Sequence, residues 1–525
     1  MNKSSKSSFT EDDVWNDINL VEKLVFAQYK GLGGFGTYNA ISGDLLFTAA
    51  SDETLFLFDY GMWVVNSGTI DASNMGAFAK DWRNKYSTIR NINMFLDRID
   101  NVPNADPAKI ARLKGEMKFM RAKAYADLIN FFGGVPLITK VYGLNDDFTE
   151  TRASYTECVN FIVKELDEAA ALVPLTVSSA DWGKITKGAC LALKSEILLY
   201  AASKLHDPSS TPNGPLFEYN ANDKWQQASD AAKAVIDMDQ YSLIPADSWV
   251  DYTKIFLDVN PEIILARPYS SQYNHANIDK FNTPNGYHGY SGHVPTQRLV
   301  DDFEMDNGKM IDEQGSGYDA NNPYKNRDPR FYADIVYQGA NYRGRETDFS
   351  LPGGLDSRDG SESWNYSLTS YTMRKFMDES LDFNSGIGSQ PYIFFRLAEI
   401  YLNYAEAQYN LGNEVVAREY VNKIRNRVKM PDISTSGQQL LKDIIRERRI
   451  ELCFEDRRYY DVRRWMIADQ TDNENATGVA WNKINGVLKS NPVTAQVRMF
   501  VPRMYYMPIP LSEIQKTGME QNPGY

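Results

Sequence analysis

The residues whose types and spacing could do chemistry are concentrated in one stretch, "IIRERRIELCFEDRRYYDVRRW", from Ile444 to Trp465. It places Glu447, Glu451 and Glu455 four residues apart and holds seven arginines. Two carboxylates can act as general acid and general base when their surroundings separate their pKa values, and clustered arginines can bind phosphate. The stretch is therefore compatible with an active site, a nucleic-acid-binding helix or a structural element.

On a helix, these glutamates lie along one stripe, where like charges repel each other. Their proximity requires cations, and Arg448, Arg458 or arginines from elsewhere in the chain could supply bidentate partners. Apolar neighbours such as Ile450 and Phe454 leave little of the helix for solvent or for a substrate cleft. We therefore predict a semi-buried ion-pair network that fixes the helix register, and no catalytic residue.

The composition restricts the class of protein. A net charge of −13 and a pI near 5.0 argue against nucleic-acid binding, which requires a surplus of Lys and Arg. Cys158, Cys190 and Cys453 lie among apolar residues in helical patterns, without CxxC spacing, so we predict inert buried thiols. The sequence contains no apolar run long enough to span a bilayer. Its start, "MNKSSKSSFTEDDVW", lacks the apolar core of a signal peptide and predicts a polar leader, followed by a helix with Thr10 as its N-cap.

Helical periodicity dominates the first half of the chain. Apolar residues repeat at helical spacing from Val14 to Val25 and from Trp82 to Asn93. Further helices are predicted in "KGEMKFMRAKAYADLINFFGG", which ends at Gly133, and in "YTECVNFIVKELDEAAALVP", "TKGACLALKSEILLYAASKL" and "KWQQASDAAKAVIDMD".

The clearest helix pair is "RLAEIYLNYAEAQYNLGNEVVAREYVNKIRNR". Ala405, Gly412 and Ala417 fall at the small-residue positions of a tetratricopeptide hairpin, where small side chains let two helices approach closely. One hairpin cannot bury its own apolar face, so we expect several to stack into a curved solenoid.

Helical periodicity fades between about Arg267 and Gln390, where Gly, Asn, Pro, Tyr and Asp dominate, and again after Gln470. A structureless loop of this length is unusual in a compact domain, so we predict an irregular lobe. The predicted fold is mainly α: one domain over residues 1–525, with a tetratricopeptide-like helical scaffold over about 9–258 and 390–467. The inserted loop-rich lobe covers about 259–389 and 468–525 and ends in a Pro-x-Pro strap and one short helix.

Three other motifs have structural interpretations. Gly31, Gly33 and Gly36 form GxGxxG, but they follow a helix instead of a strand, so we predict a helix stop and no dinucleotide site. The four histidines show no HExxH spacing, and the chain contains no GxSxG elbow. An acidic loop could hold calcium, although it lacks EF-hand spacing, and we expect no other cofactor. Its acids are Asp301, Asp302, Glu304, Asp306 and Asp312.

The stretch "RERRIELCFEDRRYYDVRRW" resembles the arginine-rich helix of the SusD/RagB family of outer-membrane nutrient-binding lipoproteins. Further similar segments follow in the family's order along nearly the whole chain: "WRNKYSTIRNINMFLDRI", "GEMKFMRAKAYADLINFFGGVPLIT", "NPEIIL", "NRDPRFYADIV", "FFRLAEIYLNYAEAQYNLGN" and "YYMPIPLSEI…NPGY". Two features depart from the family pattern. Cys453 replaces a customary small residue, and the lipid-bearing cysteine near the mature N-terminus is missing from the sequence given.

The resemblance implies a protein that is not an enzyme. It implies binding of extracellular oligosaccharide or polysaccharide and delivery to a SusC-like TonB-dependent transporter. It also implies a lipid-anchored position at the outer-membrane surface, set by a lipoprotein signal in the native precursor. Oligopeptide capture for a RagA-like transporter is the alternative, and a purely structural interaction solenoid is the third.

Sugar recognition requires exposed aromatic rings on loops, because rings stack on the apolar faces of sugars. Four tryptophans lie in helical patterns and are predicted to be core residues: Trp15, Trp82, Trp225 and Trp465. Trp63 in "DYGMWVVNSGT" and Trp364 in "SESWNYSLTSY" lie in predicted loops, in regions where family members often place ligand-stacking rings. These two are the principal ligand-binding candidates. The further candidates are the rings of Tyr287, Tyr290 and Tyr366 and the polar side chains of Asn66, Asn285, Asp359 and Asn365.

Overall fold

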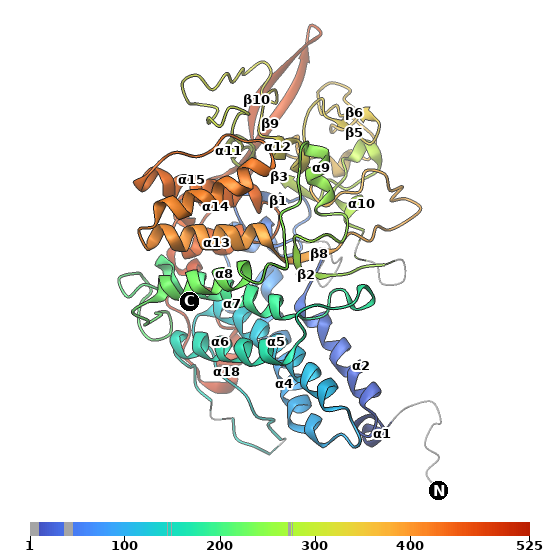
Figure 1. Cartoon of the computed structure of the whole chain (residues 1–525). Helices are drawn as coiled ribbons and strands as arrows, with labels where there is room; N and C mark the ends of the chain where they lie inside the picture. Colours follow the sequence, from blue (N-terminus) through green and yellow to red (C-terminus); the bar gives the residue numbers. More distant parts are fainter. Residues whose placement is uncertain (1–9, 36–45, 144, 149, 271–274, 276) are drawn as a thin grey trace.

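A stack of helix pairs carries an irregular lobe, seen at the top of Figure 1. The computed structural model describes residues 10–35, 46–143, 145–148, 150–270, 275 and 277–525. Each helix of the stack contacts the next, and together they bury one continuous apolar core. The helices follow the order α4 (Asp81–Arg98), α5 (Pro107–Phe132), α6 (Tyr155–Leu172), α7 (Lys187–Ala202), α8 (Lys224–Ile236), α13 (Leu397–Asn410), α14 (Glu414–Arg427) and α15 (Gly437–Glu451). The predicted mainly α, tetratricopeptide-like fold is confirmed.

The helix ends follow the capping signals of the sequence. Thr10 caps α1 (Glu11–Trp15) by accepting a hydrogen bond from the Asp13 N–H, and Gly133, with φ of 72°, ends α5. The single helix predicted across Val14 to Val25 is wrong. The Asp17 side chain accepts a hydrogen bond from the Asn19 N–H and so begins a separate helix, α2 (Ile18–Gln28).

The helix pair α13–α14 shows how small residues act in the stack. Ala405 and Ala417 are fully buried between helices, as predicted. Gly412 has a different role from the expected one, because a Cβ at this position would meet no atom within 4 Å. Its φ of 82° instead supplies the left-handed turn between α13 and α14.

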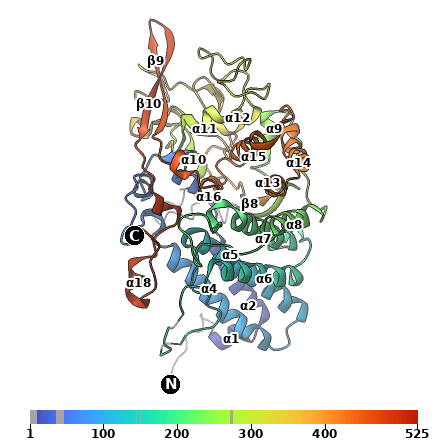
Figure 2. The ribbon, with the colours of Figure 1, turned by 90° about the vertical axis from the view of Figure 1, so that its left-hand side faces the viewer.

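The lobe consists of short helices and two-stranded sheets around a second apolar core that includes Phe303, Phe331 and Tyr371. The expected Pro-x-Pro strap precedes α18 (Leu511–Thr517). The predicted irregularity after Gln470 is wrong over 21 residues, because β9 (Ala476–Ile484) and β10 (Val487–Gln496) form a hairpin that projects from the lobe (Figures 1 and 2). The other elements of this region are β2 (Ile263–Arg267), α10 (Ile278–Asn282), β3 (His293–Pro295), α11 (Gln297–Asp302), α12 (Pro329–Asp334), β4 (Ile335–Val336), β5 (Asn341–Tyr342), β6 (Arg345–Glu346), β7 (Thr372–Met373) and β8 (Tyr392–Arg396).

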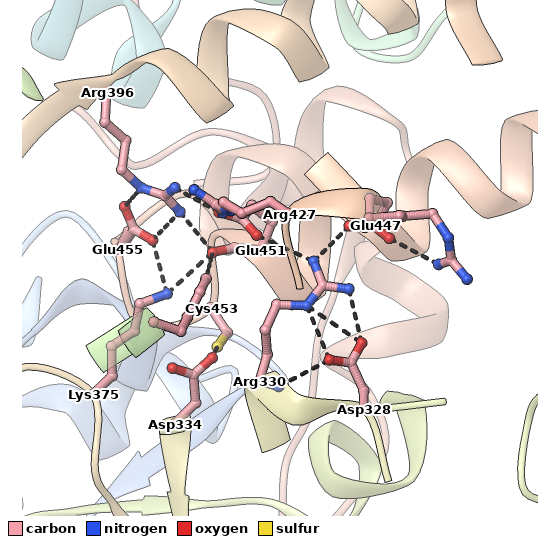
Figure 3. A network of polar contacts seen from close by, with 12 residues as sticks. Asp328, Arg330, Asp334, Lys375, Arg396, Arg427, Glu447, Glu451, Cys453 and Glu455 are labelled. Carbon is pink, nitrogen blue, oxygen red and sulfur yellow. Dashed lines mark hydrogen bonds and ion pairs between the residues drawn. The ribbon is translucent and has the colours of Figure 1, made fainter. Parts of the chain in front are cut away.

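The predicted ion-pair network around the three glutamates is confirmed (Figure 3). Glu451 is fully buried and pairs with Arg330 of the lobe, Arg396 at the end of β8 and Arg427 of α14. Glu455 accepts from Arg396 Nε at 2.7 Å and pairs with Lys375 Nζ at 2.8 Å. The network therefore joins the lobe to the helical stack.

Arg448 and Arg458 are not the partners of these glutamates. Arg448 Nε donates to Asp461 at 2.8 Å, and Arg458 donates to both oxygens of Asp52 at 2.7 and 2.9 Å. Arg449 also pairs with Asp52, at 3.1 Å. The predicted continuous helix is wrong, because α15 ends at Glu451, Glu455 lies in the turn that follows, and Arg458 begins a separate helix, α16 (Arg458–Arg464). Arg449 of α15 and Arg458 of α16 thus hold the N-terminal segment around Asp52, and Glu451 holds the lobe.

Burial alone would raise the pKa of the Glu451 carboxyl, but Arg427, Arg396 and Arg330 together hold it well below its usual range. For the pKa of Asp334, the effect of burial is larger than that of the neighbouring cation. Burial raises its pKa to about 7, although Lys375 lowers it and Cys453 donates its S–H to Oδ2 at 3.1 Å. All three cysteines are buried, as predicted.

Glu451→Gln should destabilise the fold by about 3–5 kcal/mol, because removal of one member of a buried network leaves its arginines without a counter-charge. Chemical denaturation of the purified variant measures the loss. The control is Asp237→Asn, which breaks an exposed pair with Lys233 and should hardly change the unfolding midpoint. A Glu451→Gln variant as stable as this control would contradict the structural role of the network.

Asp334→Asn should remove one component of the pH dependence of stability. The folded-state pKa of about 7 lies above the unfolded value near 3.8, so the folded protein binds more protons between these values. Asp334 therefore makes stability fall as pH rises through this window, by up to about 1.4 kcal/mol per pH unit. Melting temperatures from pH 4.5 to 7.5 should rise for the variant relative to the wild type as the pH increases. Parallel profiles for the two proteins would refute this prediction.

Candidate functional site

Two segments far apart in sequence are joined by a short β-ladder. β1 (Thr54–Phe56) pairs antiparallel with β3, so that Phe56 lies opposite His293. The Leu57 N–H extends the ladder by donating to the Gly292 carbonyl at 2.7 Å. Residues that follow β1 therefore lie beside the loop that precedes β3.

A third segment, residues 353–366, is fixed to that same loop. Asn285 is fully buried, and its Nδ2 donates to the carbonyls of Ser357 at 3.0 Å and Ser361 at 2.9 Å. Gly286 permits this approach, because a Cβ there would lie 2.4 Å from the Leu355 carbonyl oxygen. The three segments, 54–66, 278–295 and 353–366, thus converge at one place.

Five aromatic side chains from these segments form what we call the aromatic surface: Phe58, Tyr60, Trp63, Tyr290 and Trp364. The Trp364 ring lies 5.9 Å from the Tyr290 ring and 6.2 Å from the Phe58 ring, centroid to centroid. Phe58 in turn lies 5.9 Å from Tyr60. Trp364 is 65% exposed and Trp63 is 45% exposed, although both are large hydrophobic residues. The exposed Trp364 ring packs against half-buried rings, and it is therefore suited to stack on an apolar ligand face.

Trp63 lies near the end of the segment 54–66, in the short helix α3 (Met62–Asn66). Its backbone N–H donates to Asp59 Oδ1 at 3.0 Å, and its indole Nε1 donates to the Phe56 carbonyl at 3.5 Å. The turn before α3 needs Gly61, whose φ is 83° and whose Cβ would meet the Ala77 N at 2.6 Å. The structure therefore exposes both tryptophans that the sequence singled out.

Three of the polar side chains predicted to contact a ligand are buried instead of exposed. Asn66, Asn285 and Asn365 are buried, and each amide donates to a backbone carbonyl, Asn66 to that of Ala49 and Asn365 to that of Gly289. Backbone carbonyls accept the Nδ2 hydrogens of all three side chains, whereas the Oδ1 atoms of Asn285 and Asn365 are buried without a hydrogen-bond partner among the described residues. We therefore leave these asparagines out of the ligand surface and assign them to holding its loops.

The remaining candidates differ in how far they reach solvent. The half-buried Tyr287 donates its hydroxyl to the Tyr342 carbonyl at 2.7 Å, and the Arg345 guanidinium lies 3.7 Å from its ring centroid. Burial raises the pKa of the Tyr287 phenol. Tyr287 is therefore already packed on one face. Tyr366 is half-buried, and Asp359 is exposed and accepts from the Gly353 N–H at 3.1 Å.

Sequence reasoning missed Phe58 and Tyr60. Aromatic residues at Phe56, Phe58 and Tyr60 alternate, which is typical of a strand with one buried face. Only Phe56 lies in β1 and is fully buried, whereas the other two are half-buried beyond its end. The signal that could have identified them is the aromatic alternation, which continues past the end of the strand into a loop.

The predicted core tryptophans fit the helical stack. Trp82 is buried, and Trp15 and Trp225 are partly buried against the same core. Trp465 is half-buried and donates its indole N–H to Glu406 at 2.8 Å.

Two of the five acids considered for calcium have arginine partners. Asp302 pairs with Arg449, and Glu304 pairs with Arg425 at 2.8 Å. Within the described residues, no group of three or more His, Cys, Asp or Glu side chains is arranged to hold a metal ion. A helix long and apolar enough to cross a bilayer is likewise absent from the described part of the chain. Gly31 and Gly33 follow α2 as predicted, and Gly36 lies outside the described residues.

Comparison with known families covers most of the chain. The model of the SusD family matches residues 261–525. The chain belongs to the SusD family. A second model, described as starch-binding and associating with the outer membrane, matches residues 4–199. The family assignment from the arginine-rich helix and its companion segments is confirmed.

Individual SusD-like proteins are similar over most of their length. SusD-like protein P38 of Formosa agariphila is 25% identical over 408 residues, which cover 73% of this chain and 71% of the relative. A SusD-like protein from Bacteroides fragilis is 29% identical and superposes with a TM-score of 0.83, covering 98% of this chain and 99% of that one. A laminarin-binding SusD-like protein, 23% identical, superposes with a TM-score of 0.69 and covers 97% and 100%. The fold is thus shared across the family.

Asn285→Ala should loosen the loop that bears Trp364 without unfolding the protein. The substitution leaves the Ser357 and Ser361 carbonyls without their donor. Hydrogen exchange over residues 353–366 should become faster, while the melting temperature changes by only a few degrees. Asn66→Ala, which frees the Ala49 carbonyl instead, is the matched control and should not accelerate exchange in this loop. Equal exchange in both variants would show that Asn285 does not hold the loop.

Proposed function

We propose that this protein is a non-catalytic glycan-binding protein that captures oligosaccharide or polysaccharide on the aromatic surface. The observation that carries the proposal is the contact of the exposed Trp364 ring with Tyr290 and Phe58 on loops fixed by buried hydrogen bonds. Family membership supports it, because relatives include a carbohydrate-binding and a laminarin-binding SusD-like protein.

The shape of the aromatic surface agrees with this ligand class. Sugars present C–H faces to aromatic rings, and a row of rings spaced about 6 Å apart can follow an extended chain. Because the rings are in place before a ligand arrives, binding loses little side-chain entropy. A ligand platform of this kind suits capture and release more than chemistry.

We further propose that the protein delivers its ligand to a SusC-like TonB-dependent transporter at the outer-membrane surface, where a lipid anchor would hold the native form. The description of the matching family model supports the outer-membrane association. The transporter and the lipid anchor are carried over from the family resemblance. Co-purification of the native protein with an outer-membrane transporter tests this part, and recovery of the native protein in the cytoplasm without acylation would contradict it.

Trp364→Ala and Trp63→Ala should each weaken glycan binding by about 1–3 kcal/mol, the range for truncation of an aromatic anchor. This equals roughly tenfold or more in Kd. Both variants should keep the wild-type melting temperature, because exposed rings contribute little to folding. A glycan array identifies the ligand, and calorimetry on that ligand measures the loss.

Two controls separate binding from stability. Phe148→Ala removes another exposed ring, in the connection between α5 and α6, and should leave affinity unchanged. Trp82→Ala removes a buried ring and should lower stability by about 3–5 kcal/mol. If both site variants keep full affinity, the ligand binds elsewhere. Binding of peptides in place of glycans would favour oligopeptide capture.

A further inference from the structure

The charges on the three converging segments are unevenly paired. Their carboxylates, Asp59, Asp279, Asp356, Asp359 and Glu362, all accept at least one hydrogen bond from the surrounding protein. The lysine and arginine residues of these segments are Lys280 and Arg358, and neither forms an ion pair with any residue that the structure describes. Two of these carboxylates, Asp279 and Asp356, pair with Arg343 and Arg345, and the others accept from backbone N–H groups or from His288. Lys280 and Arg358 are therefore the cations of these segments that a ligand can pair with.

Lys280 is placed directly at the aromatic surface. The Tyr290 N–H donates to the Lys280 carbonyl at 2.9 Å, which fixes the two residues side by side. The Lys280 ammonium lies 5.4 Å from the centroid of the Tyr290 ring, and that ring contacts Trp364. A cation–π contact holds the ammonium in position without neutralising its charge.

Lys280 is a positive charge on a strongly negative protein. The chain has a net charge of −13, and an anionic ligand would be repelled from most of its surface. The half-buried Lys280 side chain is less screened by solvent than a fully exposed one, so it attracts an anionic group more strongly. Arg358, on the exposed loop before Trp364, adds a second cation from the neighbouring segment.

We propose that the ligand is an acidic glycan, whose sugar ring stacks on Trp364 and Tyr290 while a carboxylate or sulfate group pairs with Lys280. This inference rests on the proposed glycan-binding function and specifies its substrate class. Arg358 receives a second acidic group or a neighbouring sugar hydroxyl. A cation beside a stacking ring selects acidic over neutral sugars, because the same ring accepts both.

The test uses pairs of polysaccharides that share a backbone and differ in charge. Comparison of xylan with glucuronoxylan tests the recognition of a carboxylate, and comparison of laminarin with sulfated laminarin tests the recognition of a sulfate. The wild-type protein should bind the acidic member of at least one pair tenfold or more tightly than the neutral member, and the pair that responds identifies the acidic group.

Lys280→Met should reduce affinity for the preferred acidic glycan about tenfold and leave the affinity for the neutral backbone unchanged. Lys489→Met, which removes an exposed positive charge from β10, is the matched control and should leave both affinities unchanged. Melting temperatures of both variants should equal that of the wild type.

The outcomes separate the two proposals. Binding of neutral members as tightly as acidic ones, with a loss in Trp364→Ala, would overturn the acidic-glycan inference and leave glycan binding intact. Acidic selectivity that persists in Lys280→Met would also overturn it. Failure to bind any member of either pair, or any glycan on an array, would refute both.

Discussion

The buried pairing of Glu451 with three arginines is the interaction on which the rest of the structure depends. Arg330 comes from the lobe, Arg396 from the end of β8 and Arg427 from α14, so one carboxylate joins three segments. Burying this many charges is costly, and the cost is offset only while every partner is present. The network therefore fixes the position of the lobe relative to the helical stack. That rigidity gives the charges in the interior a structural role.

The arginine-rich stretch that carries Glu451 also fixes the aromatic surface. Arg458 and Arg449 hold Asp52, two residues before β1, and β1 leads directly to Phe58 and Trp63. Glu451 holds the lobe, from which Tyr290 and Trp364 project. The two halves of the surface are therefore positioned against each other through α15 and α16 as well as through the β1–β3 ladder. A ligand platform made of loops needs such a support, because loops alone do not maintain the spacing of their side chains.

The sequence was informative where the signal is local. Helix periodicity and caps such as Thr10 and Gly133 depend on neighbouring residues. The polar surroundings of Trp63 and Trp364 predicted that both are exposed, although Trp63 lies in helix α3 and Trp364 in the 3-10 helix Ser363–Asn365 instead of in loops. It was uninformative where partners are distant: the cations of Glu451 lie 24 to 121 residues away, so no spacing rule pointed to them. The loop asparagines misled for a related reason. From the sequence, Asn285 was expected at the surface. It is buried because Ser357 and Ser361, which are distant in sequence, lie next to it and accept its hydrogen bonds.

A crystal structure of this SusD-family protein soaked with a glycan that it binds in solution shows directly whether the aromatic surface is the ligand surface. We expect a sugar ring parallel to the Trp364 indole at van der Waals distance, about 3.5–4.0 Å, with no movement of the loop backbone. A ligand seated elsewhere, for example along the stacked helices, with Trp364 still facing solvent, would contradict this expectation.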